Sequence, residues 1–331
     1  MASDLPVIDL SLLPSNFGEK QNFSDLDGNN ELKKLREACQ ELGFFRIINH
    51  GMEAAFIQKT DSLARDMFSL AEEEKSRAIF PIFNTGYCPA DAGADGKASL
   101  PENLVFPGEN ALPNSVDQIS AKLWPHGNND FQQTVHKYNS HMTEVAHRIL
   151  KLVLLSLGLD VSKHYNSDPF GTSLQGWLRM NYYYNTKDEE EEAQNVQHIS
   201  KAHTDLGCVT ILYQDNVGGL QIRTKKGDWI NTKPLPGAFV VNLGDCLQMW
   251  SNCRYRSSEH RVVYQGLKKN QGRLSMAFFL DFIDKAEIRA PKELIDEEHP
   301  QKYKTVKFSD ITSYLMQVGP TLGGPPSYFL L

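Results

Sequence analysis

Residues 237–243, GAFVVNL, form one of six short runs that decide the fold. Each run is rich in β-branched or aromatic residues, and turn formers such as Asn216, Gly227 and Pro236 separate the runs. The others are WLRMNYYY (177–184), CVTILY (208–213), GLQIR (219–223), HRVVY (260–264) and RLSMAFFLDF (273–282). Many short strands at such spacing are typical of a sandwich or barrel, so we predict a β core over about residues 177–283.

The residues before this core have a different pattern. Apolar residues at helical spacing predict helices over 31–42, 53–70 and 128–157. The segment 80–127 is rich in Pro, Gly, Asn and Ala, which predicts irregular structure with at most short strands. Long irregular segments in compact proteins often line a site.

One domain of 331 residues is the expected organisation. It would consist of a mostly helical part over 1–170, the β core, and a C-terminal helical tail over 284–331. In fold class it would be mainly β with flanking helices.

Composition excludes several classes of function. The chain has 34 Lys and Arg against 41 Asp and Glu, a net charge of −7, which argues against binding to nucleic acid or an anionic membrane. Its five cysteines are scattered and form no Cys-x-x-Cys pair, which indicates a reducing compartment. No targeting, lipidation or membrane-spanning pattern is seen, so we expect a cytoplasmic protein, monomeric, with a small molecule as its partner.

Two histidines and an aspartate suggest a metal site. His203 and Asp205 lie two residues apart at the entry to a predicted strand, and such residues point to the same face. His260 opens another predicted strand. Two imidazoles and one carboxylate form the facial triad that suits non-haem Fe(II) and leaves coordination positions open. Taken alone, His-x-Asp is a common pattern, and a lone strand histidine is more often a packing or surface residue.

A second pair of residues adds an independent reason. Arg273 and Ser275 lie two residues apart on the strand that follows the turn KKNQG (268–272). A guanidinium fork beside a hydroxyl can hold a carboxylate in bidentate fashion. In isolation the pair would be a surface arginine and a buried serine. A metal set and a carboxylate clamp on neighbouring strands, in this order, are much less expected to coincide.

These residues resemble the signature of the 2-oxoglutarate-dependent Fe(II) dioxygenases, in particular the plant small-molecule branch with its isopenicillin N synthase-like relatives. Further matches extend from about Leu5 to Tyr314: PVIDL, GFF to INHG, MNYYY, GGLQI, and FVVNLGD followed by WSN. The resemblance implies a distorted double-stranded β-helix, or jelly roll. It also implies Fe(II) bound by His203, Asp205 and His260, and 2-oxoglutarate held by Arg273 and Ser275, with further contacts from Asn181 and Tyr183.

The implied reaction is hydroxylation or desaturation of a small plant-type metabolite, flavonoid-like or hormone-like. It would be coupled to conversion of 2-oxoglutarate into succinate and CO2, with dioxygen as oxidant and ascorbate as an expected stimulant. The resemblance places five side chains around the substrate: Leu104, Phe106, Arg179, Phe279 and Asp281. An aromatic wall with one cation and one anion suits a planar, partly polar molecule. Phe106 and Phe279 as core aromatics, and Arg179 as a surface ion pair, are the alternatives.

Three other functions remain open from the sequence. An Fe(II) oxidase on the same scaffold would not use 2-oxoglutarate, and succinate release separates it from a dioxygenase. A non-catalytic binding protein for a hormone-like ligand would tolerate loss of the metal ligands, yet all three are present. A zinc hydrolase would have no use for the arginine and serine pair. Asn242 and Asp245, which flank Gly244, are predicted to shape a turn, with support of the metal site as the alternative.

Overall fold

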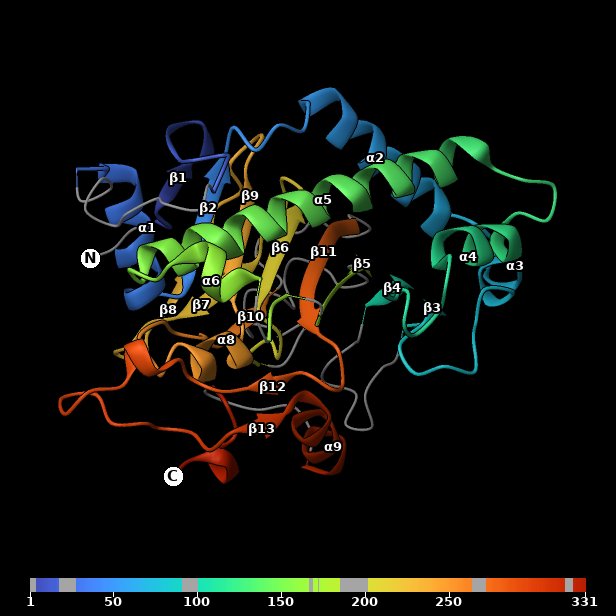
Figure 1. Ribbon diagram of the computed structural model, residues 1–331. Helices are drawn as coiled ribbons and strands as arrows, with labels where there is room; N and C mark the ends of the chain where they lie inside the picture. Colours follow the sequence, from blue (N-terminus) through green and yellow to red (C-terminus); the bar gives the residue numbers. More distant parts are fainter. Residues whose placement is uncertain are drawn as a thin grey trace.

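The computed structural model describes residues 4–17, 28–90, 101–166, 169–171, 173–184, 202–263, 272–318 and 324–331. An eight-stranded sheet runs through its centre (Figure 1). Neighbouring strands pair antiparallel, except that β1 and β2 pair in parallel. In spatial order the strands are β1 (Val7–Asp9), β2 (Phe44–Ile48), β9 (Phe239–Leu243), β6 (Val209–Gln214), β11 (Gly272–Phe282), β5 (Leu174–Tyr184), β4 (Glu102–Phe106) and β3 (Gly86–Cys88).

A smaller sheet of three strands completes the core. Its order is β10 (His260–Val262), β7 (Leu220–Arg223) and β8 (Trp229–Asn231). An isolated antiparallel bridge connects it to the segment that leads into β6, because the backbones of His203 and His260 exchange two hydrogen bonds of 3.0 and 2.9 Å. The two sheets therefore meet at two of the predicted metal ligands.

Helix α5 (Asn129–Ser156) lies across one face of the large sheet (Figure 1). It packs on β5, β6 and β11. The Asn128 side chain caps its start by accepting a hydrogen bond from the Phe131 amide, and Gly158, at a φ of 81°, follows its end. The other helices are α1 (Asn30–Glu41), α2 (Ala54–Phe68), α3 (Glu72–Ser76), α4 (Ser115–Leu123), α6 (Val161–Tyr165), α8 (Asp245–Trp250) and α9 (Phe308–Val318).

Alternation along β5 and β11 separates the two faces of the large sheet. Leu178 and Met180 on β5, with Met276 and Phe278 on β11, lie in the main core beneath the helices. The alternate residues face the interior between the two sheets, and they pair across the strands as Tyr183 with Arg273, Asn181 with Ser275, Arg179 with Ala277, and Trp177 with Phe279. Every predicted site residue on these two strands is therefore on the interior face.

The structure changes three expectations about the fold. Segment 80–127 contains the short strands β3 and β4 but also helix α4, because Val116, Ile119 and Leu123 form a buried stripe at helical spacing. The part before residue 170 supplies four strands of the large sheet, so the sheet is not confined to 177–283. The tail after 284 contains helix α9 together with a two-stranded sheet of β12 (Glu287–Ile288) and β13 (Val306–Lys307).

Candidate active site

Donor atoms of His203, Asp205 and His260 converge at the meeting point of the two sheets. Their ligand atoms all lie within 4.8 Å of one another. Oδ1 of Asp205 is 3.7 Å from Nε2 of His203 and 3.6 Å from Nε2 of His260. Because His203 and Asp205 from the segment before β6 and His260 from β10 bring their donors to one position, the group can surround a single ion in the facial arrangement that suits Fe(II).

Neighbouring side chains hold the aspartate in place. Its other oxygen, Oδ2, accepts hydrogen bonds from Oγ1 of Thr210 (2.6 Å) and from Nδ2 of Asn242 (2.7 Å). Thr210 on β6 and Asn242 on β9 are paired residues, so the sheet register sets both donors. Oδ1 therefore remains directed toward the histidines. Hydrogen-bond partners commonly orient a metal ligand in this way.

The protonation states favour metal binding. Burial raises the pKa of Asp205, but His260, His203 and the two hydrogen bonds outweigh it and leave that pKa below its usual value. Burial and the nearby His203 lower the pKa of His260 to about 4. A carboxylate and a neutral imidazole at pH 7 are the forms that bind a metal ion.

Arg273 and Ser275 lie together on the interior face of β11. Arg273 is only 1% exposed, and its Nη1 donates to Oγ of Ser275 at 3.2 Å. Its guanidinium lies 4.9 Å from the centroid of the Tyr183 ring, and its Nε donates to the carbonyl of Gly218. Asn181 is the strand partner of Ser275 and is also buried. The four residues expected to contact 2-oxoglutarate are thus neighbours in the structure.

Arg273 also shows that this site suits an anion. Within the described part of the chain, no hydrogen-bond partner reaches its buried Nη2, and no carboxylate pairs with the guanidinium. A buried charge without a counter-charge is costly, so a bound carboxylate would relieve the cost. The donor set fits the distal carboxylate of 2-oxoglutarate.

Three of the five expected substrate residues lie on the same interior face. The ring of Phe279 stacks on Trp177 with centroids 4.0 Å apart, and Nε1 of Trp177 donates to Asp281 at 2.7 Å. Phe279 also pairs with Thr210, a neighbour of the metal donors. Arg179 donates from Nε to Oδ1 of Asn103 at 2.8 Å, and burial lowers its pKa.

Leu104 and Phe106 do not join them, which corrects the expectation for these two residues. Both are fully buried in the core beneath the helices, where the Phe106 ring lies 6.4 Å from that of Phe131. Leu104 pairs with Met180, which lies in that same core, whereas Asn103 pairs with Asn181 on the interior face. A shift of one residue along a strand exchanges the two faces, so Asn103 takes the place that was assigned to Leu104.

Sequence reasoning missed three residues of this site: Thr210, Trp177 and Asn103. Asn242 was predicted to shape a turn, with support of the metal site as the alternative; it lies on β9 and contacts Asp205, in agreement with the alternative. Alternation could have found Trp177, since it lies two residues before Arg179 on the same strand. Thr210 and Asn242 required knowledge of which strands pair.

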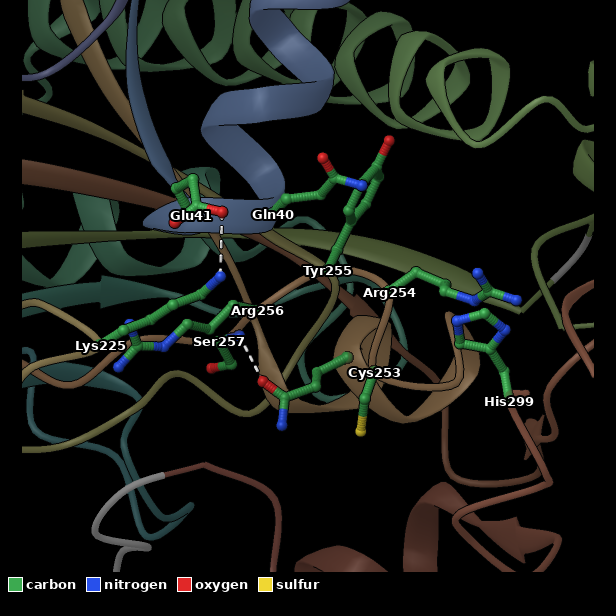
Figure 2. Close-up of a pocket in the computed structure, with 10 residues that line it drawn as sticks. Gln40, Glu41, Lys225, Cys253, Arg254, Tyr255, Arg256, Ser257 and His299 are labelled. Carbon is green, nitrogen blue, oxygen red and sulfur yellow. Dashed lines mark hydrogen bonds and ion pairs between the residues drawn. The ribbon is translucent and has the colours of Figure 1, made fainter.

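A separate cavity of about 590 Å³ is lined by other residues (Figure 2). Its walls come from the end of α1, the loop before β10 and Lys225, which pairs with Glu41 at 3.1 Å. None of the metal donors or clamp residues lines it.

Within the described ranges, every helix is too short or too polar to cross a bilayer.

Comparisons with known proteins agree with this geometry. The model of the 2OG-Fe(II) oxygenase superfamily matches residues 175–282, and the model described as non-haem dioxygenase in morphine synthesis N-terminal matches residues 5–127. The 2-oxoglutarate-dependent dioxygenase DAO of rice is 32% identical, with 97% of each chain covered. A gibberellin 20-oxidase-like protein of Arabidopsis thaliana is 31% identical, with 89% of this chain and 86% of the relative covered.

Solved structures show the same relationship. The crystal structure of the rice dioxygenase for auxin oxidation matches with a TM-score of 0.80 at 30% identity, covering 99% of this chain and 100% of that one. JOX2 in complex with 2OG, Fe and JA matches with a TM-score of 0.76 at 27% identity, covering 97% and 87%. These likenesses confirm the predicted double-stranded β-helix core with flanking helices.

Three observations agree with one another: the converging donor atoms, the buried Arg273 on β11 and the family matches. The chain belongs to the 2OG-Fe(II) oxygenase superfamily and is a 2-oxoglutarate-dependent dioxygenase, which uses Fe(II), 2-oxoglutarate and dioxygen.

Proposed function

We propose that the enzyme hydroxylates or desaturates a planar, acidic, hormone-like metabolite. In this proposal His203, Asp205 and His260 hold Fe(II), and Arg273 with Ser275 binds the distal carboxylate of 2-oxoglutarate. Asn181 and Tyr183 border the co-substrate. The observation that carries the co-substrate assignment is the buried Nη2 of Arg273, for which the described residues offer no partner.

With iron and co-substrate bound, oxidative decarboxylation of 2-oxoglutarate supplies the oxidising power that attacks a C–H bond of the substrate. The chain itself contributes orientation. Thr210 and Asn242 fix Asp205, and the fork of Arg273 sets the direction of the co-substrate. The stacked pair of Trp177 and Phe279 forms an apolar wall beside Thr210, against which the substrate would lie. Position of the substrate on this wall decides between hydroxylation and desaturation.

Arg179 supports an acidic substrate. In the described part of the chain its guanidinium donates to the neutral Asn103, and no carboxylate lies within ion-pair distance. The side chain faces the interior opposite Ala277. Burial lowers the pKa of Arg179, and Asp205 opposes this shift without a direct contact. A carboxylate of the substrate would provide a counter-charge in direct contact. The relatives named for auxin oxidation and the JOX2 complex with JA are consistent with a hormone-like acid.

An Fe(II) oxidase that does not use 2-oxoglutarate is the second candidate. It is less well supported because it gives the buried Arg273 no ligand.

We also propose that the chain acts as one dioxygenase unit, as a cytoplasmic monomer. Support for a single unit comes from the main hydrophobic core, to which residues from Ile8 to Phe329 contribute.

Succinate release tests this function. Planar carboxylic acids and their methyl esters are screened with Fe(II) and 2-oxoglutarate, and succinate is compared with product. We expect a one-to-one ratio with an acid and no turnover by Asp205→Ala. Replacement Arg179→Met should raise KM for the acid by about 30-fold, equivalent to ~2 kcal/mol, because a buried charge loses its partner. The native enzyme and the Arg179→Met variant should oxidise the methyl ester equally.

Two results would contradict the proposal. Product formation without succinate would favour the oxidase. An equal effect of Arg179→Met on acid and ester would show that Arg179 does not bind a substrate carboxylate.

A further inference from the structure

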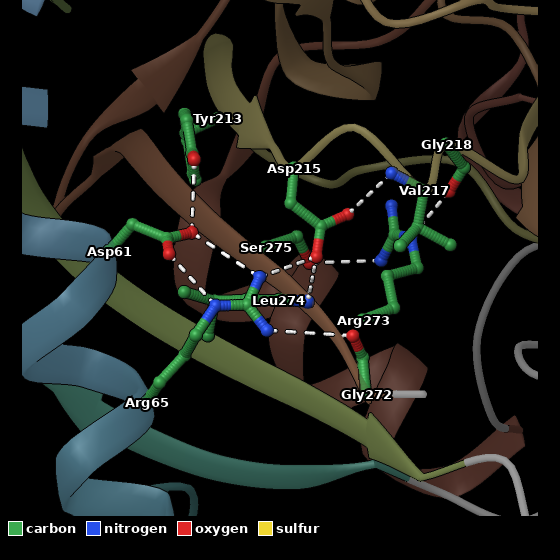
Figure 3. Close-up of polar contacts among 10 residues, drawn as sticks. All are labelled: Asp61, Arg65, Tyr213, Asp215, Val217, Gly218, Gly272, Arg273, Leu274 and Ser275. Carbon is green, nitrogen blue, oxygen red and sulfur yellow. Dashed lines mark hydrogen bonds and ion pairs between the residues drawn. The ribbon is translucent and has the colours of Figure 1, made fainter. Parts of the chain in front are cut away.

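Asp215 lies at the end of β6 and supports the strand that carries the clamp (Figure 3). Its Oδ2 accepts a hydrogen bond of 2.7 Å from the backbone amide of Leu274. Leu274 is the residue between Arg273 and Ser275, so this bond fixes the backbone from which both clamp side chains extend. Its carboxylate is only 8% exposed.

The same carboxylate also fixes the loop that holds Arg273. Its Oδ1 accepts from the backbone amide of Val217 at 3.1 Å. The next residue, Gly218, presents the carbonyl to which Nε of Arg273 donates (Figure 3). One side chain therefore sets two anchors of Arg273: its strand and its carbonyl partner. Nη2, which is left without a partner among the described residues, is directed by these anchors.

Helix α2 connects to this arrangement through Arg65. Nη2 of Arg65 lies 2.7 Å from Oδ2 of Asp215, and its Nε donates to Oδ1 of Asp61 at 2.8 Å. The hydroxyl of Tyr213 donates to the other oxygen of Asp61 at 2.9 Å. Arg65 thus supplies the counter-charge that a nearly buried Asp215 requires. The network crosses from the helical layer to the clamp strand (Figure 3).

We propose that Asp215, held by Arg65, is a positioning residue for the co-substrate clamp, so that helix α2 sets the affinity for the distal carboxylate of 2-oxoglutarate. This proposal rests on the clamp role given above to Arg273. A general contribution to stability would need only that the network joins the helix to the sheet. The contacts are more specific, because both amides bound by Asp215 belong to the backbone that orients Arg273.

Asp215→Asn is the first variant to test. One oxygen remains, so the side chain keeps its shape but cannot accept from Leu274, Val217 and Arg65 together. We expect the Kd of 2-oxoglutarate, measured by anaerobic calorimetry on the Fe(II)-loaded enzyme, to rise about 10- to 100-fold. KM should rise in parallel while kcat at saturating co-substrate changes less. With 2-oxovalerate, which lacks the distal carboxylate, Asp215→Asn and the native enzyme should bind equally.

Arg65 provides a second, graded series in case Asp215→Asn fails to fold. Arg65→Gln should weaken 2-oxoglutarate binding, and Arg65→Lys should restore part of it because the positive charge remains but the fork does not. Arg148→Gln is the matched control. Arg148 on α5 also ties two parts of the chain together, by donating to the carbonyls of Leu10, Leu13 and Pro14, but it lies outside the network. The Arg148→Gln variant should have a lower melting temperature than the native enzyme and an unchanged Kd for 2-oxoglutarate.

The outcomes separate this proposal from the proposed function. If Arg273→Gln leaves 2-oxoglutarate affinity unchanged, the clamp assignment itself is wrong. If Arg273→Gln weakens binding but the Asp215 and Arg65 variants do not, only the positioning role is wrong. Equal losses for 2-oxoglutarate and 2-oxovalerate would show that the network stabilises the site as a whole and not the clamp.

Discussion

At the residue scale, Asp205 depends on Asn242 and Thr210. These two side chains bind one carboxylate oxygen and leave the other for the metal. Asn242 is 3% exposed, so water does not easily replace its amide. The orientation of the ligand is therefore determined by a residue on β9, which is distant from it in sequence.

Replacement Asn242→Ala should weaken Fe(II) binding. The carboxylate would lose one of its two anchors and could rotate away from the histidines. We expect about a 10-fold rise in the Kd of Fe(II), measured anaerobically with a competing chelator. Asn231→Ala is the control, since Asn231 lies on β8 and bonds to Gln221 on the small sheet. A Kd that is unchanged in Asn242→Ala would show that Thr210 alone orients Asp205.

The sequence singled out His203, Asp205 and His260 as candidate metal donors, and the structure brings their donor atoms within 4.8 Å of one another. Spacing alone was a weak signal, because His-x-Asp is a common pattern, and the Arg273 and Ser275 pair together with the family resemblance made the prediction specific. Asn242 could not be assigned in the same way. Its contact depends on β9 lying beside β6 with Thr210 opposite Asn242, and strand order is not encoded in the spacing of the residues.

At the element scale, the turn from β9 into α8 supports the segment that carries Asp205. The amides of Asp245 and Cys246 donate to the carbonyls of Asp205 (2.8 Å) and Leu206 (2.9 Å), and the amide of Gly244 donates to Cys208 (3.0 Å). A Cβ at Gly244 would lie 2.3 Å from the carbonyl oxygen of Gly207. Backbone packs on backbone here, which only glycine permits.

Gly244→Ala should therefore disturb both stability and metal binding. The added methyl group meets main-chain atoms that cannot rotate away, so residues 205–207 must shift. We expect a loss of about 1–3 kcal/mol in the free energy of unfolding, the usual cost of overpacking, together with weaker Fe(II) binding. Gly28→Ala is the matched control, because a Cβ at Gly28 meets nothing within 4 Å. Native metal affinity in Gly244→Ala would contradict this account.

Secondary-structure elements were predicted well where a regular apolar spacing continues over many residues, and poorly where a strand is short. Helix α5 was found because its apolar stripe continues over many turns and Asn128 and Gly158 mark its ends. Leu104 and Phe106 were placed at the substrate by resemblance, and the five residues of β4 are all buried, so burial does not distinguish Leu104 from Asn103. Only the register of β4 with β5 separates the two faces.

At the scale of the whole molecule, the interior between the two sheets gathers charges that must be neutral or paired. Asp281 faces this interior near the metal donors. Burial raises the pKa of Asp281 to about 7, the nearby Asp205 adds to the rise, and the hydrogen bond from Trp177 opposes it. In the metal-free protein a second carboxylate thus holds its proton up to neutral pH.

This pKa makes stability depend on pH in a defined direction. The pKa of Asp281 is about 7 in the folded state and 3.8 for an ordinary aspartate, so between these values the folded chain binds a proton that the unfolded chain has released. The contribution of Asp281 is therefore present at low pH and is lost as the pH rises through about 7.

Asp281→Asn keeps an acceptor for Trp177 but cannot ionise. Thermal or urea unfolding of the metal-free proteins measures this. Between about pH 5 and pH 8, the free energy of unfolding of the variant should rise relative to that of the native protein by on the order of 2 kcal/mol. Parallel stability curves for the two proteins across this range would mean that Asp281 is already ionised at pH 5, and that its carboxylate is better solvated than its burial implies.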